Sequence, residues 1–523
     1  MVKSNGGIIG PDNVTTGGFS GVASGVFKLG EVTDLIRESK WPEVSPFINT
    51  IPNSVRLDGG GTYFSRTQTA GNRRTWTQSG WYKFDGIDPG NAQSLVSTNG
   101  TNTGTNFHYT LEKGGSSGGA SDTLSCHGYG GDIFQTTRLL RDYSGWYHIV
   151  LAVDTTQGTS ANRMKLYVNG ESVTMSEQAQ YPAQNFEFGV NNNGIVIGLG
   201  THPGSVSGYQ FSGYMANIEL VDGLAYGPEY FGSTNADSGI WTPVPTSTIS
   251  SYGTNGFKLA FANASALGTD TSGQSNNFTA NSITSIDQST DSPSNNFSTL
   301  NELATSSYND LTDGSLTVTG NTSTNDAETF SSIIMPNATG KWYWEIKCIT
   351  TYGTANPKFG FIQASRGFRL QNGGAGYGGA TNPAYDIMIR PDGKAIINGS
   401  TSGSAIIGTW GTGDTLSFAL DSVNGAFYVG INGTWQTSGN PTSGSSRTGA
   451  VKTWSPTQGG STGALDGQAV CIGSFNGSVS SINFGNPPYA LSSAVADANG
   501  LGQFEYAPPT DYFSLCTNNL NVI

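Results

Sequence analysis

The chain has 523 residues, which is too long for one ordinary hydrophobic core and predicts two or three domains. Charged residues make up only 12% of it, whereas glycine occurs 74 times and aromatic residues reach 11%, a composition typical of short strands joined by many turns. The net charge is −13 and no run of lysine or arginine occurs, which argues against direct binding of nucleic acid, because phosphate binding requires clustered cations.

The cysteines and the hydropathy pattern indicate where the protein is made. The four cysteines, Cys126, Cys348, Cys471 and Cys516, show no C-x-x-C spacing. The last three lie in apolar runs, which indicates buried thiols rather than zinc ligands. Their placement does not require an oxidising compartment, and it leaves a disulfide open. No apolar run approaches the roughly 18 residues of a membrane-spanning helix, and the N-terminus lacks the apolar core of a secretory signal. We expect a soluble protein that is made in a cytoplasm and is not inserted into a membrane.

Residues 1–48 differ from the rest of the chain. A glycine-rich, irregular stretch is followed by "LGEVTDLIRESKWP", whose apolar residues form one helical stripe ended by a Trp-Pro pair: Leu29, Val32, Leu35, Ile36, Trp41 and Pro42. A helix of about three turns is too short to be stable alone, so its stripe must pack against something. It either packs on the next domain of the same chain or anchors the protein to a larger assembly.

Strand-like segments follow one another from residue 49 to 285, with turn signals between them, which predicts a two-sheet β-sandwich or jelly roll. The segment "GWYHIVLAVD" is almost continuously apolar, which is typical of a central strand covered on both faces. "MKLYVNGESVT" predicts a hairpin, because Asn169-Gly170 suits a type I′ turn in which both central residues have positive φ.

Four segments in this region follow in the order of a known family: "RTWTQSGWYKF", "GWYHIVLAVDTTQ", "KLYVNGESV" and "FSGYMANIELVDG". The series resembles a laminin-G-like, concanavalin-A-like jelly roll. In that family the second strand carries tryptophan and histidine and the third ends in an Asn-Gly hairpin, here Trp146, His148 and Asn169-Gly170. The resemblance implies a lectin-like sandwich.

Residues 286–300 belong to a polar, turn-rich stretch that predicts a linker, and strand-like segments resume over 301–523. This second series resembles a SPRY domain, another two-sheet sandwich. The family has a Trp/Tyr-rich strand that ends in glutamate, here "WYWE", and a long hairpin matched at Gly413, Asp414, Leu416, Leu420, Asp421, Asn424-Gly425, Phe427, Asn432-Gly433 and Trp435. The predicted fold class is therefore all-β, with two β-sandwich (jelly-roll) domains in tandem behind a short N-terminal irregular and helical anchor.

Enzymatic activity is not expected from the carboxylates. Retaining glycoside hydrolysis needs two carboxyl groups about 5 Å apart, which one strand supplies through a same-face spacing such as E-x-D-x-x-E, and no such triplet occurs. Glu345 stands alone, with Tyr343 and Lys347 as its same-face neighbours, which is typical of a paired surface group.

A serine or histidine centre is not expected either. The pattern Gly114-x-Ser116-x-Gly118 lies in a Gly/Ser tract rather than between the strand and helix of a nucleophile elbow. His148 alternates with apolar residues on a strand, where a packed histidine is commoner than a catalytic base.

Binding is the chemistry that the loops offer. Sugar recognition combines aromatic faces with amide and hydroxyl groups, and Tyr377, Trp410 and Trp454 are the candidate glycan contacts, with packing beneath a loop as the alternative for each. No cofactor is predicted, although laminin-G-like domains sometimes hold calcium on loop carboxylates. Asp122 and Asp132 are candidate ligands for such an ion, or stray loop residues.

Three runs resemble structural proteins of marine bacteriophages: "IIGPDN…ASGVFKLGEV…KWP", "SRTQTAGNRRTWTQSGWYKF" and "GQFEYAPPTDYFSLCTNNL". The resemblance implies a virion protein, a tail fibre or capsid-associated fibre, assembled in the host cytoplasm. Its first fifty residues or so would attach to other virion proteins, and its sandwiches would contact a host-surface polysaccharide or receptor. It also implies a homo-oligomer, commonly a trimer, in which many weak sugar contacts act together. A purely structural decoration protein and a polysaccharide-degrading spike are the alternatives.

Overall fold

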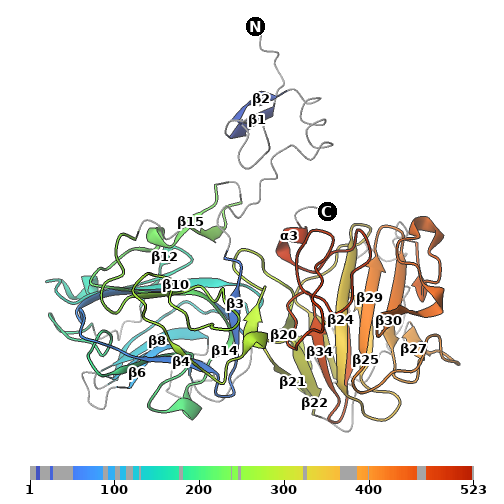
Figure 1. Cartoon of the computed structure of the whole chain (residues 1–523), viewed down its shortest axis with the longest axis horizontal. Helices are drawn as coiled ribbons and strands as arrows, with labels where there is room; N and C mark the ends of the chain where they lie inside the picture. Colours follow the sequence, from blue (N-terminus) through green and yellow to red (C-terminus); the bar gives the residue numbers. More distant parts are fainter. Residues whose placement is uncertain are drawn as a thin grey trace, which may run out of the picture.

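A computed structural model describes most of the two predicted sandwich regions (Figure 1). The described residues are 8–11, 24–27, 51–85, 92–99, 106–112, 122–128, 131–175, 181–236, 238–244, 249–321, 327–364, 386–397, 400–455 and 467–520. In residues 1–48, which we call the head, β1 (Ile8–Pro11) pairs with β2 (Ser24–Phe27). The helix predicted over Leu29–Pro42 lies outside the described residues. Of the helices that are described, none has the length and apolar character needed to cross a bilayer.

The first sandwich consists of two antiparallel sheets. The 8-stranded sheet has the order β12-β11-β10-β5-β14-β3-β19, with β17 also pairing with β14: β12 (Glu171–Ser172), β11 (Met164–Val168), β10 (Tyr147–Asp154), β5 (Thr75–Phe84), β14 (Ser212–Asp222), β3 (Ser54–Asp58), β19 (Gln288–Ser289) and β17 (Phe257–Leu259). The 7-stranded sheet has the order β18 (Thr279–Asn281), β4 (Tyr63–Thr67), β13 (Val196–Leu199), β6 (Gln93–Asn99), β7 (Asn106–Glu112), β8 (Thr123–Gly128) and β9 (Gly131–Gln135). A separate hairpin joins β15 (Gly232–Thr234) to β16 (Trp241–Pro243).

The second sandwich repeats this architecture and confirms the all-β, tandem-sandwich prediction (Figure 1). One sheet has the order β20 (Leu300–Thr305), β23 (Ala327–Ser331), β33 (Gln468–Ser474), β25 (Lys358–Gln363), β26 (Ile387–Ile389), β27 (Ala395–Ile397) and β28 (Ser400–Thr401). The other has the order β21 (Asn309–Thr312), β22 (Thr317–Gly320), β34 (Val479–Asn483), β24 (Lys341–Thr350), β29 (Thr415–Asp421), β30 (Ala426–Ile431) and β31 (Thr434–Trp435), with β32 (Lys452–Thr453) beside β30.

Helical structure is limited to short turns in the described residues. These are α3 (Thr517–Leu520) and the 3-10 segments η1 (Ser160–Asn162), η2 (Val206–Gly208), η3 (Pro228–Tyr230), η5 (Ser285–Asp287), η6 (Gln436–Ser438) and η7 (Gly444–Ser446). The four cysteines are buried thiols and none of them is in a disulfide, which answers the question left open by the sequence.

Strand β10 lies between β11 and β5, as its continuous apolar pattern predicts. Ile149, Leu151 and Val153 face the core between the two sheets, whereas Val150 belongs to a separate apolar cluster on the outer face of the same sheet. Residues 226–252 supply much of that outer cluster, so both faces of the strand are covered by protein. A strand buried on both faces carries apolar residues at successive positions because neither side meets water.

Both sandwiches use an Asn-Gly turn to close an edge hairpin. In the first, Asn169 has φ 51° and Gly170 has φ 79°; in the second, Asn432 has φ 47° and Gly433 has φ 78°. Each pair is a two-residue loop, because the flanking residues pair directly across it. Positive φ at both central positions is the requirement of a type I′ turn, so the turn predicted at residue 169 is confirmed.

The two turns are also held in the same way. The asparagine side chain accepts a hydrogen bond from a neighbouring strand in each case, from the His148 N–H at 2.8 Å in the first and the Thr415 N–H at 3.0 Å in the second. An aromatic ring covers each glycine: a Cβ atom there would lie 2.4 Å from Trp241 or 2.8 Å from Tyr506. The glycines are therefore required both by backbone φ and by close contact.

Residues 286–300, predicted as a linker, are hydrogen-bonded to both sandwiches. At one end β19 pairs with β3 of the first sandwich, and at the other the Ser298 N–H donates to Leu515 O of the second at 2.9 Å. A direct contact across the two sandwiches joins the Tyr214 hydroxyl to Gly314 O at 3.0 Å. The two sandwiches thus lie against one another through this segment (Figure 1).

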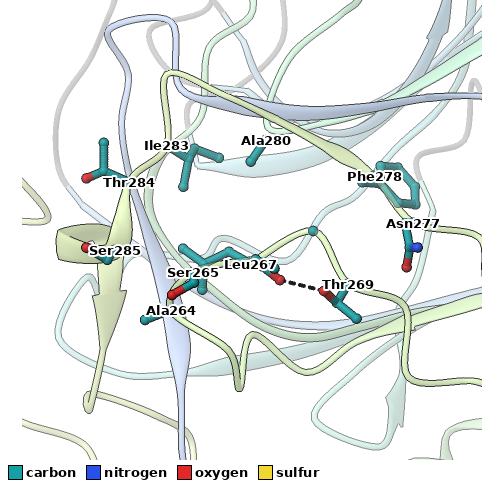
Figure 2. Close-up of a pocket in the computed structure, with 12 residues that line it drawn as sticks. Ala264, Ser265, Leu267, Thr269, Asn277, Phe278, Ala280, Ile283, Thr284 and Ser285 are labelled. Carbon is teal, nitrogen blue, oxygen red and sulfur yellow. Dashed lines mark hydrogen bonds between the residues drawn. The ribbon is translucent and has the colours of Figure 1, made fainter.

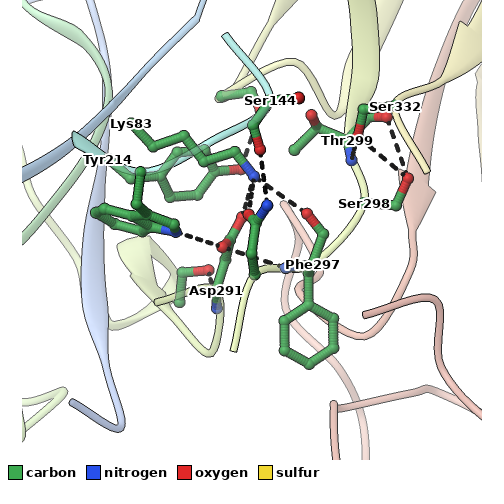
Figure 3. Close-up of polar contacts among 12 residues, drawn as sticks. Lys83, Ser144, Tyr214, Asp291, Phe297, Ser298, Thr299 and Ser332 are labelled. Atoms are coloured by element: carbon green, nitrogen blue, oxygen red, sulfur yellow. Dashed lines mark hydrogen bonds and ion pairs between the residues drawn. The ribbon is translucent and has the colours of Figure 1, made fainter. Parts of the chain in front are cut away.

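A buried polar network stabilises this segment, and we call it the junction network. It consists of Lys83, Asp291 and Phe297, which Figure 3 labels, together with Trp146 and Asn296. Lys83 Nζ lies 2.8 Å from Asp291 Oδ2, and the two side chains are 1% and 0% exposed. The same Nζ donates to Asn296 Oδ1 at 2.7 Å and to Phe297 O at 3.1 Å. Trp146 Nε1 donates to Asp291 Oδ1 at 3.0 Å. Burial raises the pKa of Asp291, and the Lys83 ammonium offsets part of this rise.

Candidate functional site

A serine–histidine pair lies on the outer face of the 8-stranded sheet of the first sandwich. His148 Nε2 lies 2.9 Å from Ser79 Oγ, and Trp241 Nε1 lies 3.0 Å from His148 Nδ1. The imidazole is buried and stacks on Trp81, with ring centroids 4.6 Å apart. Burial lowers the pKa of His148 to about 3, so the ring is neutral at physiological pH.

The hydrogen bonds of His148 assign its tautomer. Indole Nε1–H can only donate, so His148 Nδ1 accepts and the single proton of the neutral ring lies on Nε2. That Nε2–H donates to Ser79 Oγ. In a serine hydrolase the histidine nitrogen facing the serine must instead accept the serine proton. The pair therefore has the opposite polarity to a nucleophile and its base.

The sequence pattern predicts that Glu345, the lone carboxylate of the second sandwich, is a surface group. The structure shows instead that it is buried. Glu345 is 0% exposed. One carboxylate oxygen accepts from the Tyr343 hydroxyl at 2.9 Å and the Tyr506 N–H at 2.8 Å; the other accepts from the Glu505 N–H at 2.9 Å and Asn483 Nδ2 at 3.2 Å. Burial raises the pKa of Glu345, and the donors partly offset this rise. The carboxylate fixes residues 505–506 onto β24, which explains its burial without any catalytic role.

Of the two candidate calcium ligands, Asp122 is described in full and its carboxylate is engaged in other contacts. Asp122 accepts a hydrogen bond from the Tyr143 hydroxyl at 2.6 Å, and Arg141 Nε lies 3.7 Å from its other oxygen. The side chain of Asp132 is outside the described part of the chain. Within that part, no group of three or more His, Cys, Asp or Glu side chains is close enough to hold a metal ion. A carboxylate that faces a hydroxyl donor and a guanidinium does not suit a calcium ligand.

Two of the three predicted glycan contacts, Trp410 and Trp454, lie in the core of the second sandwich. Trp410 and Trp454 are each 6% exposed. The Trp410 ring stacks on Phe359 with centroids 4.8 Å apart, and the Trp454 ring lies 5.7 Å from Phe361. Their rings are covered by the protein's own side chains, as the packing alternative expects. Tyr377 lies outside the described residues.

A groove of about 530 Å³ lies on the first sandwich between residues 264–269 and 277–285 (Figure 2). Its apolar lining is Ala264, Ala266, Leu267, Phe278, Ala280 and Ile283, and its polar lining is Ser265, Thr269, Asn277, Thr284 and Ser285. One wall contains β18, the edge strand of the 7-stranded sheet. Every lining side chain is uncharged.

The groove walls are held by hydrogen bonds on either side. The Phe278 N–H donates to Gly268 O at 2.8 Å and joins the two walls. The loop between them is organised by Asp270, whose carboxylate accepts from the N–H groups of Lys258 (2.9 Å), Ser272 (2.8 Å) and Asn276 (2.8 Å). At the other end of the groove, Thr284 and Asp287 form the capping box of η5. These bonds preserve the shape of the groove in the absence of a ligand.

This groove is not foreseen from the sequence because its residues fall in a polar, turn-rich tract. The available signal was the alternation of Phe278 and Ala280 with polar neighbours, followed by Ile283, which is the pattern of a half-buried edge strand. That alternation covers only a few residues, which is too short to stand out from a loop.

A second hollow, of about 430 Å³, is lined by Gly71, Asn72, Arg73, Arg74, Thr75, Thr156 and Glu187. Glu187 bridges the two arginines: Arg73 Nη1 lies 2.9 Å from one carboxylate oxygen and Arg74 Nη2 lies 2.8 Å from the other. This arrangement connects residues 71–75 to the loop around residue 187, and it leaves one net positive charge at the hollow.

Comparison with protein families identifies the fold type of the first sandwich. Residues 58–224 match the model of the concanavalin A-like lectin/glucanases superfamily. The first sandwich thus has a lectin-type jelly-roll fold, as the laminin-G-like resemblance implies. No curated protein matches the chain.

Three solved structures resemble parts of the chain. The SPRY domain of human HERC1 is 15% identical, covers 32% of this chain and 87% of its own, and has a TM-score of 0.21. A candidate carbohydrate-binding protein from Bacteroides ovatus is 18% identical; the match covers 45% of this chain and 60% of that protein, with a TM-score of 0.32. The native heptameric SAP-like pentraxin of Limulus polyphemus is 15% identical, with 34% and 79% covered and a TM-score of 0.26. We draw no functional conclusion from similarities at this level.

Proposed function

We propose that this chain is a non-enzymatic adhesive protein of a bacteriophage virion that binds host-surface glycans. The observation that carries the proposal is the lectin-type fold of residues 58–224. Since a fold alone does not imply a function, the binding site itself has to be identified from its own residues. Since the same superfamily name includes glucanases, the absence of enzymatic activity needs its own support. That support comes from the proton on His148 Nε2 and from the Glu345 carboxylate, which backbone and side-chain donors of the same chain surround.

The finer assignment, a tail fibre or capsid-associated fibre, is supported by the three runs that resemble phage structural proteins. Residues 1–48 then attach the protein to other virion proteins. The junction network holds the two sandwiches together, which suits an appendage that displays adhesive surfaces at fixed spacing. A homo-oligomer raises the overall avidity of weak sugar contacts without any new contact.

A binding assay combined with a chemical assay tests the adhesive function. The full chain is immobilised, titrated with purified host-surface polysaccharide, and the supernatant is assayed for reducing ends. We expect saturable binding that free polysaccharide competes, and no release of reducing ends. The absence of binding would favour a structural decoration protein, whereas released reducing ends would establish a degrading spike.

Particle labelling tests the virion assignment. An antibody against residues 301–523 should label purified particles of a phage that encodes this chain, at the tail or on the capsid. Deletion of residues 1–48 should abolish incorporation while the deleted chain still binds polysaccharide. Incorporation of the deleted chain at the wild-type level would contradict the anchoring role of the head.

A further inference from the structure

We propose that the groove between residues 264–269 and 277–285 is a saccharide site that selects a neutral pyranose unit. This inference rests on the proposed glycan-binding function and names both the site and the class of sugar. The groove lies outside residues 58–224, the region matched by the family, so it is not assigned by that similarity. Its volume of about 530 Å³ falls in the range of roughly 300–1,000 Å³ that is typical of small-ligand sites.

The apolar residues on the two walls of the groove suit the apolar face of a sugar ring. Ala280 and Ile283 on one wall and Leu267 on the other present aliphatic carbon, as Figure 2 shows for the opposed walls. Phe278, which is 6% exposed, also lines the groove, and its ring packs against Phe257 in a T-shaped pair with centroids 4.6 Å apart. The C–H face of a pyranose is apolar enough to bury against such a surface.

The rim offers polar groups that the described part of the chain does not use. Neither the Ser265 nor the Ser285 hydroxyl makes a hydrogen bond to any described residue, and both side chains line the groove. Asn277 Oδ1 accepts from the Asp270 N–H at 2.9 Å, which orients the amide, while its Nδ2 donor has no partner among the described residues. These groups can bind sugar hydroxyls by both donating and accepting.

The lack of charge in the lining points to a neutral sugar. Recognition of a uronate or sulfate ordinarily uses arginine, whose planar guanidinium matches an oxyanion with two hydrogen bonds. No lining residue of the groove is charged, whereas the hollow at Arg73 and Arg74 carries a net positive charge. An acidic saccharide would thus prefer the arginine hollow. A neutral saccharide has no charge that needs an arginine partner, so it can bind in the uncharged groove.

The test compares two groove variants with a control variant in the full chain. Ala280→Trp fills the groove from an exposed position on edge strand β18, outside the core. The double variant Ser265→Ala, Ser285→Ala removes only the two unused hydroxyls. Arg74→Ala alters the second hollow and is the matched control. Circular dichroism and thermal unfolding establish that each variant is folded. The probes are neutral hexose oligosaccharides and uronate-containing oligosaccharides, screened as an array and then titrated by calorimetry.

We expect the wild-type chain to bind a neutral oligosaccharide, with at least a tenfold loss in Ala280→Trp, about a tenfold loss in the double serine variant and no change in Arg74→Ala. Unchanged affinity in folded Ala280→Trp would overturn the groove assignment while the glycan-binding function stands. A wild-type preference for uronates that Arg74→Ala abolishes would do the same. Absence of binding to either class by the wild-type chain would overturn both proposals.

Discussion

Replacement of Lys83 by methionine should weaken the connection between the two sandwiches. Methionine keeps the aliphatic volume but removes the ammonium, so the Asp291 carboxylate stays buried without its counter-charge. At 2.8 Å and an effective dielectric constant of about 20, the attraction of this pair is about 6 kcal/mol before desolvation is subtracted. Since removing one member of a buried ion pair costs about 3–5 kcal/mol, we expect a loss of that size in the free energy of unfolding.

Urea denaturation followed by tryptophan fluorescence measures this loss. The double variant Lys83→Met, Asp291→Asn should recover most of the stability, because the amide oxygen still accepts from Trp146 while no charge is left buried. Arg138→Met is the control: it breaks the Arg138–Glu171 pair, whose side chains are 37% and 75% exposed, and should cost less than about 1 kcal/mol. Equal effects of Lys83→Met and Arg138→Met would refute a stabilising role for the junction network.

Three further predictions concern the pH dependence and the packing of the fold. His148 has a folded pKa of about 3, below its unfolded value, so its contribution to stability is complete above pH 6.5 and is lost as the pH falls toward 3. In urea titrations, the free energy of unfolding of the wild type should fall by about 3 kcal/mol more than that of His148→Gln between pH 7 and 4. An equal pH dependence of the two free energies would contradict this. Gly433→Ala should lower the free energy of unfolding by more than Gly477→Ala, a glycine with nearly the same φ of 79° and nothing within 4 Å, because only the former meets Tyr506; equal losses of about 1 kcal/mol would show that backbone φ alone matters. Trp410→Ala should lower the free energy of unfolding by about 3–5 kcal/mol because it leaves a cavity, and the glycan affinity of the folded protein should not change. A loss of glycan affinity in calorimetry without this loss of stability would show that Trp410 is a sugar contact after all.

Several buried polar groups of this fold could not be assigned from their local sequence. Glu345 has a lysine two positions later, as many surface carboxylates do, yet residues 505–506 cover it and supply two of its donors. The junction segment has the serine- and asparagine-rich composition of a linker, but its polar groups find partners in both sandwiches, so they are buried without the cost of an unsatisfied hydrogen bond.

The sequence by itself determined the features that depend on neighbouring residues. The alternation within each strand, the continuous apolar run of β10 and the Asn-Gly turns all follow from side-chain period and backbone φ, which are local properties. Tertiary structure alone decided which segments cover the faces of each sheet, where Trp410 and Trp454 point, and how residues 264–269 meet 277–285 to form the groove. These outcomes depend on contacts between segments far apart in the chain, and no local pattern specifies which distant segment will cover a given surface.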